Sequence, residues 1–476
     1  MELILFFSLT LFFALAIFFM RSKLFTRGAS LLFSVSLIGL TIHGWMHIDE
    51  SPVHFFTFSH EGLLLLSALA LLSLPTFYHG FRYTQNASVK HFNIYHISMM
   101  ALMTFMTGAY LSDSMTMLWV FVEATTLSVA ALIYHDRTPQ SLEATWKYVF
   151  ICSVGISIAY VGILLLGFIY GRYDAANLTF DEFSLLVSQA NPIYLKVAFV
   201  FVLVGFSTKM GLFPMHSVTI DAHSVAPAPV SALISTTLMN VGFLAIFRVF
   251  TLFSSTEILP FMQHSLVLTG ILSLLIAAGY MLKAYHIKRM FAYSSLEMMG
   301  LVAIAMGSGK SGYYAAILLI LLHSLVKSSI FFHMGQFKNV THSYTLKQVG
   351  NYMKSYPAGG LLLLCCVVFI LAIPPSGIFI SEILIFKSII AQQHWITFVV
   401  TALLLTAVIY ALLTRVLHIL FSDPAEPLTE AEAPGKARPV ETIPQFVLLI
   451  IVAVLCFYQP DFLNEAINAS IANLPK

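Results

Sequence analysis

The stretch GFSTKMGLFPMHSVTIDAHSVAPAPVS, residues 205–231, joins the end of an apolar segment to a polar one. Lys209 lies in the apolar part, and Pro214 follows five residues later. Proline lacks a backbone N–H and interrupts the hydrogen-bond ladder of a helix. A broken helix at membrane depth is tolerated only where it is buried in protein or lines a polar cavity. The stretch therefore predicts a discontinuous membrane helix with a buried lysine; the alternative is a plain kink with a lysine that snorkels to the membrane surface.

Composition places the whole chain in a membrane. Of its 476 residues, 59% are hydrophobic and 10% are charged, and the mean hydropathy is +0.87. These values exclude a soluble domain and predict a polytopic all-α membrane protein that lies in a lipid bilayer. The first apolar run, residues 3–20, has no small-residue cleavage site after it, so we expect a retained span rather than a signal peptide.

Hydropathy predicts about fourteen transmembrane helices, with discontinuous helices 7 and 12. In the twelfth, Pro374, Pro375 and Gly377 are expected to break the helix just before Glu382. The predicted spans are 3–20, 29–48, 60–78, 94–112, 114–134, 146–170, 192–213, 228–250, 265–283, 290–308, 312–336, 357–391, 396–421 and 443–460.

Two halves of the chain share a pattern. Each has a glutamate inside a span, Glu123 or Glu297, and a proline-broken helix near a lysine, Lys209 or Lys387. Inverted repeats with discontinuous helices are typical of secondary transporters, and a block of five spans inverts topology. We therefore predict two inverted five-helix repeats. The predicted divisions are 1–93 for spans 1–3, 94–250 and 265–421 for the two half-channel repeats, 422–442 for a flexible cytoplasmic loop, and 443–476 for the C-terminal span.

The distribution of positive charge predicts the orientation. Most of the 24 Lys and Arg residues fall in one of the two sets of loops between the predicted spans. By the positive-inside rule, both termini then lie outside the cytoplasm, as expected for a multi-pass protein of a bacterial or archaeal plasma membrane. The 171–191 loop, with Asp174, Asp181 and Glu182, is expected to hold a short amphipathic segment outside the cytoplasm.

No cofactor site is expected from the sequence. The four cysteines show no CxxC motif and no Cys/His spacing typical of zinc, iron–sulfur or haem sites. They are Cys152, Cys365, Cys366 and Cys456. A net charge of +2 gives no indication of a nucleic-acid partner. We expect neither a metal nor a redox centre in this chain, so it would not by itself be a redox enzyme.

In the first half, Glu123 has no Asp, Glu, Lys or Arg within nine positions on either side. A lone carboxylate in hydrocarbon is costly unless it is neutral or meets a cation, and acids inside spans are functional by default. Lys209 is the natural partner, because it is the only lysine inside a predicted span of the first half. The alternative is a neutral carboxyl group hydrogen-bonded to a neighbouring helix.

In the second half, His323 and Lys327 are four residues apart and share one face of a helix. Glu382 and Lys387 follow the second break at a spacing of five, which places them on one face only if the break unwinds a residue. Lone histidines such as His43, His47 and His96 are better explained by hydrogen bonds in the core or at the membrane interface.

Several motifs resemble those of the antiporter-like proton-translocating subunits of respiratory complex I, membrane-bound hydrogenases and Mrp-type cation/proton antiporters. Among these, the sequence is most similar to hydrogenase-4 component F. The resemblance covers roughly spans 4 to 13. It rests on Lys209 with PMHSVTIDAHSVAPAPVSAL at 214–233, SLEATWKYV at 141–149, HIKRMFAYSSLEMMG at 286–300, HSLVKSSIFFHMG at 323–335 and PPSGIFISEILIFK at 374–387.

This resemblance implies a lateral relay of glutamate, lysine and histidine along the middle of the membrane. Carried over by motif, Glu123 and Lys209 form a coupled pair, Lys327 is the central lysine of the second half, and Glu382 or Lys387 is the terminal group. Glu297 and His323 join the relay, with His216, Asp221 and His223 beside the path. The chain departs from the family in its eighth span and before its DAHS segment. The eighth span offers Ser235 and Asn240 in place of a lysine or histidine, and Val218 and Ile220 replace a tryptophan and a proline. We expect ordered water to fill the gap beside Ser235 and Asn240.

The function that the resemblance implies is proton translocation within a multisubunit redox-driven complex, of hydrogenase-4 or complex I type. The partners would be other membrane subunits and protons, or Na⁺. Two alternatives within transport are an Mrp-type sodium/proton antiporter subunit and the membrane subunit of a proton-driven inorganic-carbon uptake complex. A third, from a different class, is an inert scaffold that no longer moves ions.

Overall fold

The computed structural model describes residues 2–169, 179–187, 190–426 and 437–475. Within these ranges nearly all residues are helical, and β-structure is limited to isolated bridges such as Phe56 with Ser112. The chain forms two compact units. Unit 1 comprises residues 1–230, 237–265 and 465–476, and unit 2 comprises 231–236 and 266–464.

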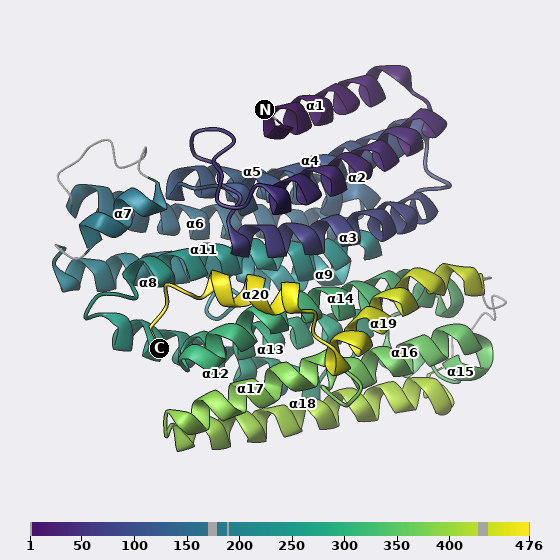
Figure 1. Cartoon of the computed structure of the whole chain (residues 1–476). Coiled ribbons are helices and arrows are strands. Elements are labelled where there is room, and N and C mark those ends of the chain that lie inside the picture. Colours follow the sequence, from purple (N-terminus) through teal and green to yellow (C-terminus); the bar gives the residue numbers. More distant parts are fainter. Residues whose placement is uncertain (1, 170–178, 188–189, 427–436, 476) are drawn as a thin grey trace. The chain divides into compact units, whose positions relative to one another are not determined.

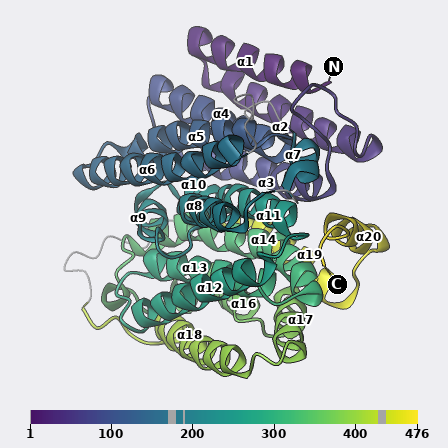
Figure 2. The same ribbon diagram turned by 90° about the vertical axis from the view of Figure 1, so that its left-hand side faces the viewer.

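Unit 1 is a bundle of long helices in which neighbours along the chain pack together from α1 to α6 (Figure 1). Its central contact is that of α6 with α8, and α9 packs against α6 (Figure 2). Its helices are α1 Glu2–Met20, α2 Lys23–Met46, α3 His60–Tyr83, α4 Val89–Leu111, α5 Met115–Ile133, α6 Pro139–Ile169, α7 Phe180–Val187, α8 Pro192–Met210, α9 Ser217–Val225 and α11 Met239–Phe253.

Unit 2 is built around α14, which contacts α13, α16, α17 and α19. Its helices are α13 Ile287–Met306, α14 Lys310–Thr341, α15 Tyr352–Ser355, α16 Pro357–Ile370, α17 Gly377–Ala391, α18 Trp395–Phe421 and α19 Ile443–Phe457. The boundary between the units cuts three helices and one π-helical turn: α10 Ala228–Leu233, η3 Ile234–Leu238, α12 Leu259–Leu282 and α20 Asp461–Ser470.

The helices confirm a polytopic all-α membrane protein. Among the described residues, 12 helices are long and apolar enough to cross a membrane. The other two predicted spans coincide with α13 and with the pair α16 and α17, so each predicted span has its helix. Lipid-facing surface is plain on α1, where Phe12, Phe18 and Phe19 are exposed. The division into inverted repeats stays a prediction.

Both predicted helix breaks are present, and their backbones are alike. Helix α8 ends before Gly211, which has φ +75°, and α16 ends just before Ala372, which has φ +51°. In each break the next residue donates its N–H to the carbonyl five residues earlier, Leu212 to Ser207 and Ile373 to Val368. This is the Schellman arrangement, which satisfies the last carbonyls of a helix. A proline follows three residues after each left-handed residue, at Pro214 and Pro375.

Two predicted loops are covered only in part. In the 171–191 segment, the short helix α7 includes Asp181 and Glu182, whereas Asp174 lies outside the described residues. Most of the predicted flexible loop at 422–442 also lies outside them. Its first residues are held to the loop that follows α14, where Asn351 N donates to the Ser422 carbonyl at 2.8 Å.

A buried arginine joins three helices of unit 1. Arg248 on α11 is only 7% exposed, and its Nε lies 3.3 Å from Glu61 Oε1 at the start of α3. The same guanidinium donates to Ser59 Oγ at 3.1 Å and to the carbonyls of Tyr110 and Ser112 at the end of α4. Those carbonyls have no partner within their own helix, so the arginine caps α4 while it pairs with α3.

We expect Arg248→Met to destabilise the protein by about 3–5 kcal/mol, because it strands Glu61 and the carbonyls in a buried site. Glu61→Gln combined with Arg248→Met should cost less than the sum of the two single changes. The measurement is thermal unfolding of the purified chain in one detergent. Lys90→Met removes an exposed lysine of unit 1 and serves as the control; equal melting temperatures for the Arg248 and Lys90 variants would contradict the assignment.

Candidate functional site

Close packing of α6 against α8 places the first lysine. A Cβ on Gly205 of α8 would lie 2.5 Å from the Cβ of Ala159 on α6, and one on Gly155 would lie 2.2 Å from Thr208 Cγ2. Small residues at these positions let the two backbones approach, as is common between membrane helices. The last turn of α8, which carries Lys209, is thereby pressed against α6.

Lys209 is buried, with 2% of its surface exposed. Its Nζ donates to Thr126 Oγ1 at 2.7 Å and lies 3.4 Å from both Thr125 Oγ1 and the hydroxyl of Tyr148. The same Nζ is 5.3 Å from the centre of the Tyr148 ring, within the range of a cation–π contact. The ammonium group is therefore surrounded by three hydroxyls and an aromatic ring contributed by α5 and α6.

Thr126 connects Lys209 to Glu123. The Thr126 hydroxyl accepts from Lys209 and lies 3.4 Å from Glu123 Oε2, while Ser153 Oγ donates to Glu123 Oε1 at 2.9 Å. None of the ion pairs among the described residues joins the lysine directly to the glutamate. The structure thus brings the two predicted partners to either side of one hydroxyl, in an arrangement through which a proton or a change of charge can be passed.

The predicted residues after the break lie on or beside α9, which contacts both α6 and α8. Thr219 Oγ1 donates to the Thr208 carbonyl at 3.2 Å and so ties α9 to the turn that carries Lys209. His223 is fully buried on α9, whereas His216 and Asp221 are half-buried.

In unit 2, Lys327 is fully buried and is held by α13. Its Nζ donates to the Phe291 carbonyl at 2.7 Å and to the Ser294 hydroxyl, and it lies 5.9 Å from the centre of the Phe291 ring. Ser294 is three residues before Glu297, on the same face of α13. His323, also fully buried, is one turn before Lys327 on α14.

Glu297 and Glu382 line the same cavity. Its volume is about 230 Å³, and its wall also includes Ile370 and Phe386. Glu297 is 2% exposed, and its Oε2 has no hydrogen-bond partner among the residues that the structure describes. Two carboxyl groups from α13 and α17, far apart in sequence, therefore face one enclosed space.

Lys387 does not share this space. Glu382 and Lys387 both lie in the regular helix α17, where five residues correspond to a rotation of about 140°. The expectation that the break unwinds a residue and brings them to one face is wrong, because the irregular backbone ends before Gly377. Glu382 faces the cavity and Lys387 is exposed.

The eighth span contains a local distortion where its motif departs from that of its relatives. Residues Ile234–Leu238 form a π-helical turn, a feature that often occurs at functional sites. Ser235 lies in this turn and forms a 2.7 Å hydrogen bond with Ser295 of α13, while Asn240 follows it, fully buried, on α11.

Sequence reasoning did not single out the hydroxyls that hold the lysines. Thr126 lies three residues after Glu123, so helical spacing alone could have placed it on the same face of α5. Tyr148 and Ser153 on α6, and Ser294 on α13, carried no such signal relative to a lysine in a different part of the chain.

Comparison with known proteins places these features in a family. Residues 112–409 match the family model described as NADH:quinone oxidoreductase/Mrp antiporter, TM. A hydrogenase-4 component F homolog from Methylacidiphilum infernorum is 30% identical over 434 residues, which cover 87% of this chain and 88% of that protein.

Two solved structures share the fold. A chain of the membrane-bound sulfane sulfur reductase, an archaeal respiratory membrane complex, matches with a TM-score of 0.84 and 20% identity, covering 99% of this chain and 97% of the other. A chain of the Mrp complex from Dietzia sp. DQ12-45-1b matches with a TM-score of 0.84 and 15% identity, covering 99% and 96%.

Gly242 on α11 gives a test of how Lys209 is positioned. A Cβ there would lie 2.3 Å from the Met210 nitrogen and 2.8 Å from the Lys209 carbonyl carbon, so even alanine must push the end of α8 away. We expect Gly242→Ala to cost about 1–3 kcal/mol, measured by thermal unfolding in detergent. The matched control is Gly39→Ala in α2, where a Cβ meets nothing within 4 Å. Similar stability of the two variants would show that the contact is not restrictive.

Proposed function

Because the chain belongs to the NADH:quinone oxidoreductase/Mrp antiporter membrane family, we propose that it is a proton-translocating subunit of a multisubunit membrane complex. The observation that carries the proposal is the contact of buried Lys209 with Glu123 through the Thr126 hydroxyl. A lysine at membrane depth is costly, so a site that shields it and connects it to a carboxylate has to serve a purpose other than packing. This argues against an inert scaffold.

In this mechanism Lys209 holds and releases a proton, and Glu123 controls how strongly it is held. The two groups act as a unit, since the charge on one changes the proton affinity of the other. Thr126 can relay the effect, because a hydroxyl both donates and accepts. His216, Asp221 and His223, on and beside α9, are proposed to lie along the path.

We propose that the second half uses Lys327 and His323 with Glu297, and that Glu382 rather than Lys387 is the terminal group. The support is geometric: Glu297 and Glu382 line one cavity, and Lys387 does not. Between the halves, water beside Ser235 and Asn240 is proposed to complete the path, since an amide and a hydroxyl can orient ordered water.

The parent complex is proposed to be of hydrogenase-4 or complex I type, with the redox centres in other subunits. The support is the similarity to a hydrogenase-4 component F homolog over most of both chains. We further propose a bacterial or archaeal plasma membrane as the location, with both termini outside the cytoplasm, from the loop charges.

A sodium/proton antiporter subunit is the second candidate. The cavity shared by Glu297 and Glu382 favours it, because carboxylate oxygens are the ligands that hard cations prefer. Replacing Na⁺ by K⁺ during transport by vesicles that carry the whole complex distinguishes the two. Unchanged proton movement supports the first proposal, and its loss supports the second.

We expect Glu123→Gln and Lys209→Met each to abolish most proton translocation without loss of assembly. Either change removes a charge that balances the other group in a poorly solvated site. The double variant should be no worse than the worse single variant, because effects within one unit are not additive. The measurement is proton pumping by vesicles that carry the whole complex, with complex abundance checked on a native gel. Near-normal pumping by either single variant at normal abundance would remove the pair from the mechanism.

Thr126 tests the hydroxyl connection separately. Thr126→Val keeps the size of the side chain but removes the hydroxyl between Lys209 and Glu123, so pumping should fall by about tenfold, the equivalent of one hydrogen bond to a charged group. Thr126→Ser retains the hydroxyl and should preserve most activity. The control is Thr406→Val, a change on an exposed threonine of α18. Equal pumping by the valine and serine variants would exclude the relay through this hydroxyl.

A further inference from the structure

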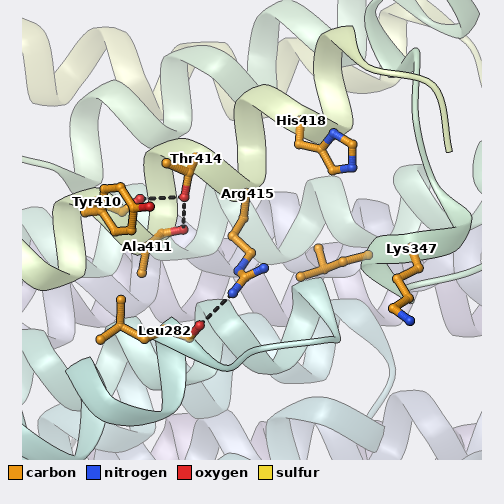
Figure 3. A pocket seen from close by; sticks show the side chains of 8 residues that line it. Leu282, Lys347, Tyr410, Ala411, Thr414, Arg415 and His418 are labelled. Atoms are coloured by element: carbon orange, nitrogen blue, oxygen red, sulfur yellow. Dashed lines mark hydrogen bonds between the residues drawn. The ribbon is translucent and has the colours of Figure 1, made fainter. Parts of the chain in front are cut away.

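A second cavity, of about 490 Å³, lies at one end of unit 2 (Figure 3). It is bounded by Leu282 at the end of α12, by Leu346 and Lys347 after α14, and by one face of α18. None of these residues takes part in the proposed proton path. This cavity is the feature of the chain that the proposed function leaves unexplained.

Arg415 is the principal polar group of the cavity. Its Nη2 donates to the Leu282 carbonyl at 2.6 Å, and its buried Nε has no hydrogen-bond partner among the described residues. A guanidinium carries five N–H donors, and a single carbonyl leaves most of them without an acceptor. None of the ion pairs that the described residues form includes Arg415. The positive charge at the cavity is therefore not compensated.

Two further basic groups surround Arg415. His418 lies three residues later on α18, and Lys347 faces it from the loop after α14 (Figure 3). Lys347 pairs with Glu426 at 3.0 Å, but both side chains are more than half exposed, and such surface pairs contribute little. Lys347 can therefore turn to another anion at small cost.

The surroundings of the cavity are also positively charged. The loop between α12 and α13 pairs with the segment after α14, where Leu346 N donates to the Tyr285 carbonyl at 2.9 Å. Lys288 and Lys338 both lie over the ring of Tyr344, at 5.7 and 5.6 Å. This end of unit 2 thus concentrates cations where helices leave the apolar region.

The opposite end of the cavity is apolar. Along α18, Tyr410 and Ala411 lie one turn before Thr414 and Arg415, on the same face of the helix. Tyr410 is 64% exposed and Leu282 is 42% exposed. The cavity therefore changes over about two helical turns, roughly 12 Å, from basic groups to apolar and aromatic surface. A free anion would use only one end of it, whereas a lipid matches both.

We propose that this cavity binds an anionic phospholipid, with its phosphate at Arg415, Lys347 and His418 and its acyl chains along Tyr410 and Leu282. A planar guanidinium binds phosphate oxygens in pairs, and basic pockets between membrane helices suit anionic headgroups. The site is separate from the proton path, so its test does not depend on the proposed function.

The test is native mass spectrometry of the full chain in detergent, titrated with phosphatidylglycerol or with phosphatidylcholine of the same acyl chains. The expected result is at least tenfold tighter binding of phosphatidylglycerol by the unaltered chain. Arg415→Gln should reduce that preference by about tenfold, since it removes one charged hydrogen-bond donor group. Lys347→Gln should reduce it less, and it tests the site without disturbing the Leu282 contact.

The matched control is Lys354→Gln, which removes an exposed positive charge from the same end of unit 2 but not from the cavity wall. It should leave the preference unchanged. Equal loss in the Lys354 and Arg415 variants, or no preference in the unaltered chain, would overturn the proposal. Displacement of the lipid by inorganic phosphate at equal concentration would overturn the lipid assignment, because only the headgroup end would then contribute.

Discussion

The fold of this protein depends on placing ammonium groups where water cannot reach them. Lys209 and Lys327 are each at most 2% exposed, and neither touches a carboxylate directly. Each instead donates to side-chain hydroxyls and lies near an aromatic ring, Tyr148 in unit 1 and Phe291 in unit 2. Hydroxyl oxygens and ring faces stabilise a cation without fixing it as firmly as an ion pair does. A group that must gain and lose its charge is served by such surroundings.

This requirement explains the close helix contacts. Hydroxyls on short side chains reach an ammonium only if the backbones that carry them come near, and the glycines and alanines of α6 and α8 allow that approach. The buried Arg248 secures other helices of unit 1, away from this site, through a direct ion pair. The chain thus uses a direct pair where a charge is permanent and mediated contacts where it is meant to change.

Much of this architecture could be predicted from the sequence because it is written locally. Apolar runs of sufficient length predicted the spans, and a proline next to a charge predicted both breaks. What could not be predicted depends on contacts between distant residues. Glu297 and Glu382 share a cavity only because α13 and α17 both pack on α14, and no spacing along the chain reports that. The choice between Glu382 and Lys387 likewise required knowing where the regular helix begins. The roles of these residues, the repeat boundaries and the orientation stay predictions.

The two helix breaks carry one further consequence. Counted back from the left-handed residue, Lys209 in the first break occupies the position that Ile370 occupies in the second. Ile370 lines the cavity of Glu297 and Glu382, so that position faces polar chemistry in both halves even though only one half places a cation there. The turn thus acts as a socket whose backbone is indifferent to what it displays. Two halves with such sockets can diverge in their chemistry, one residue at a time, while the chain path around them stays the same.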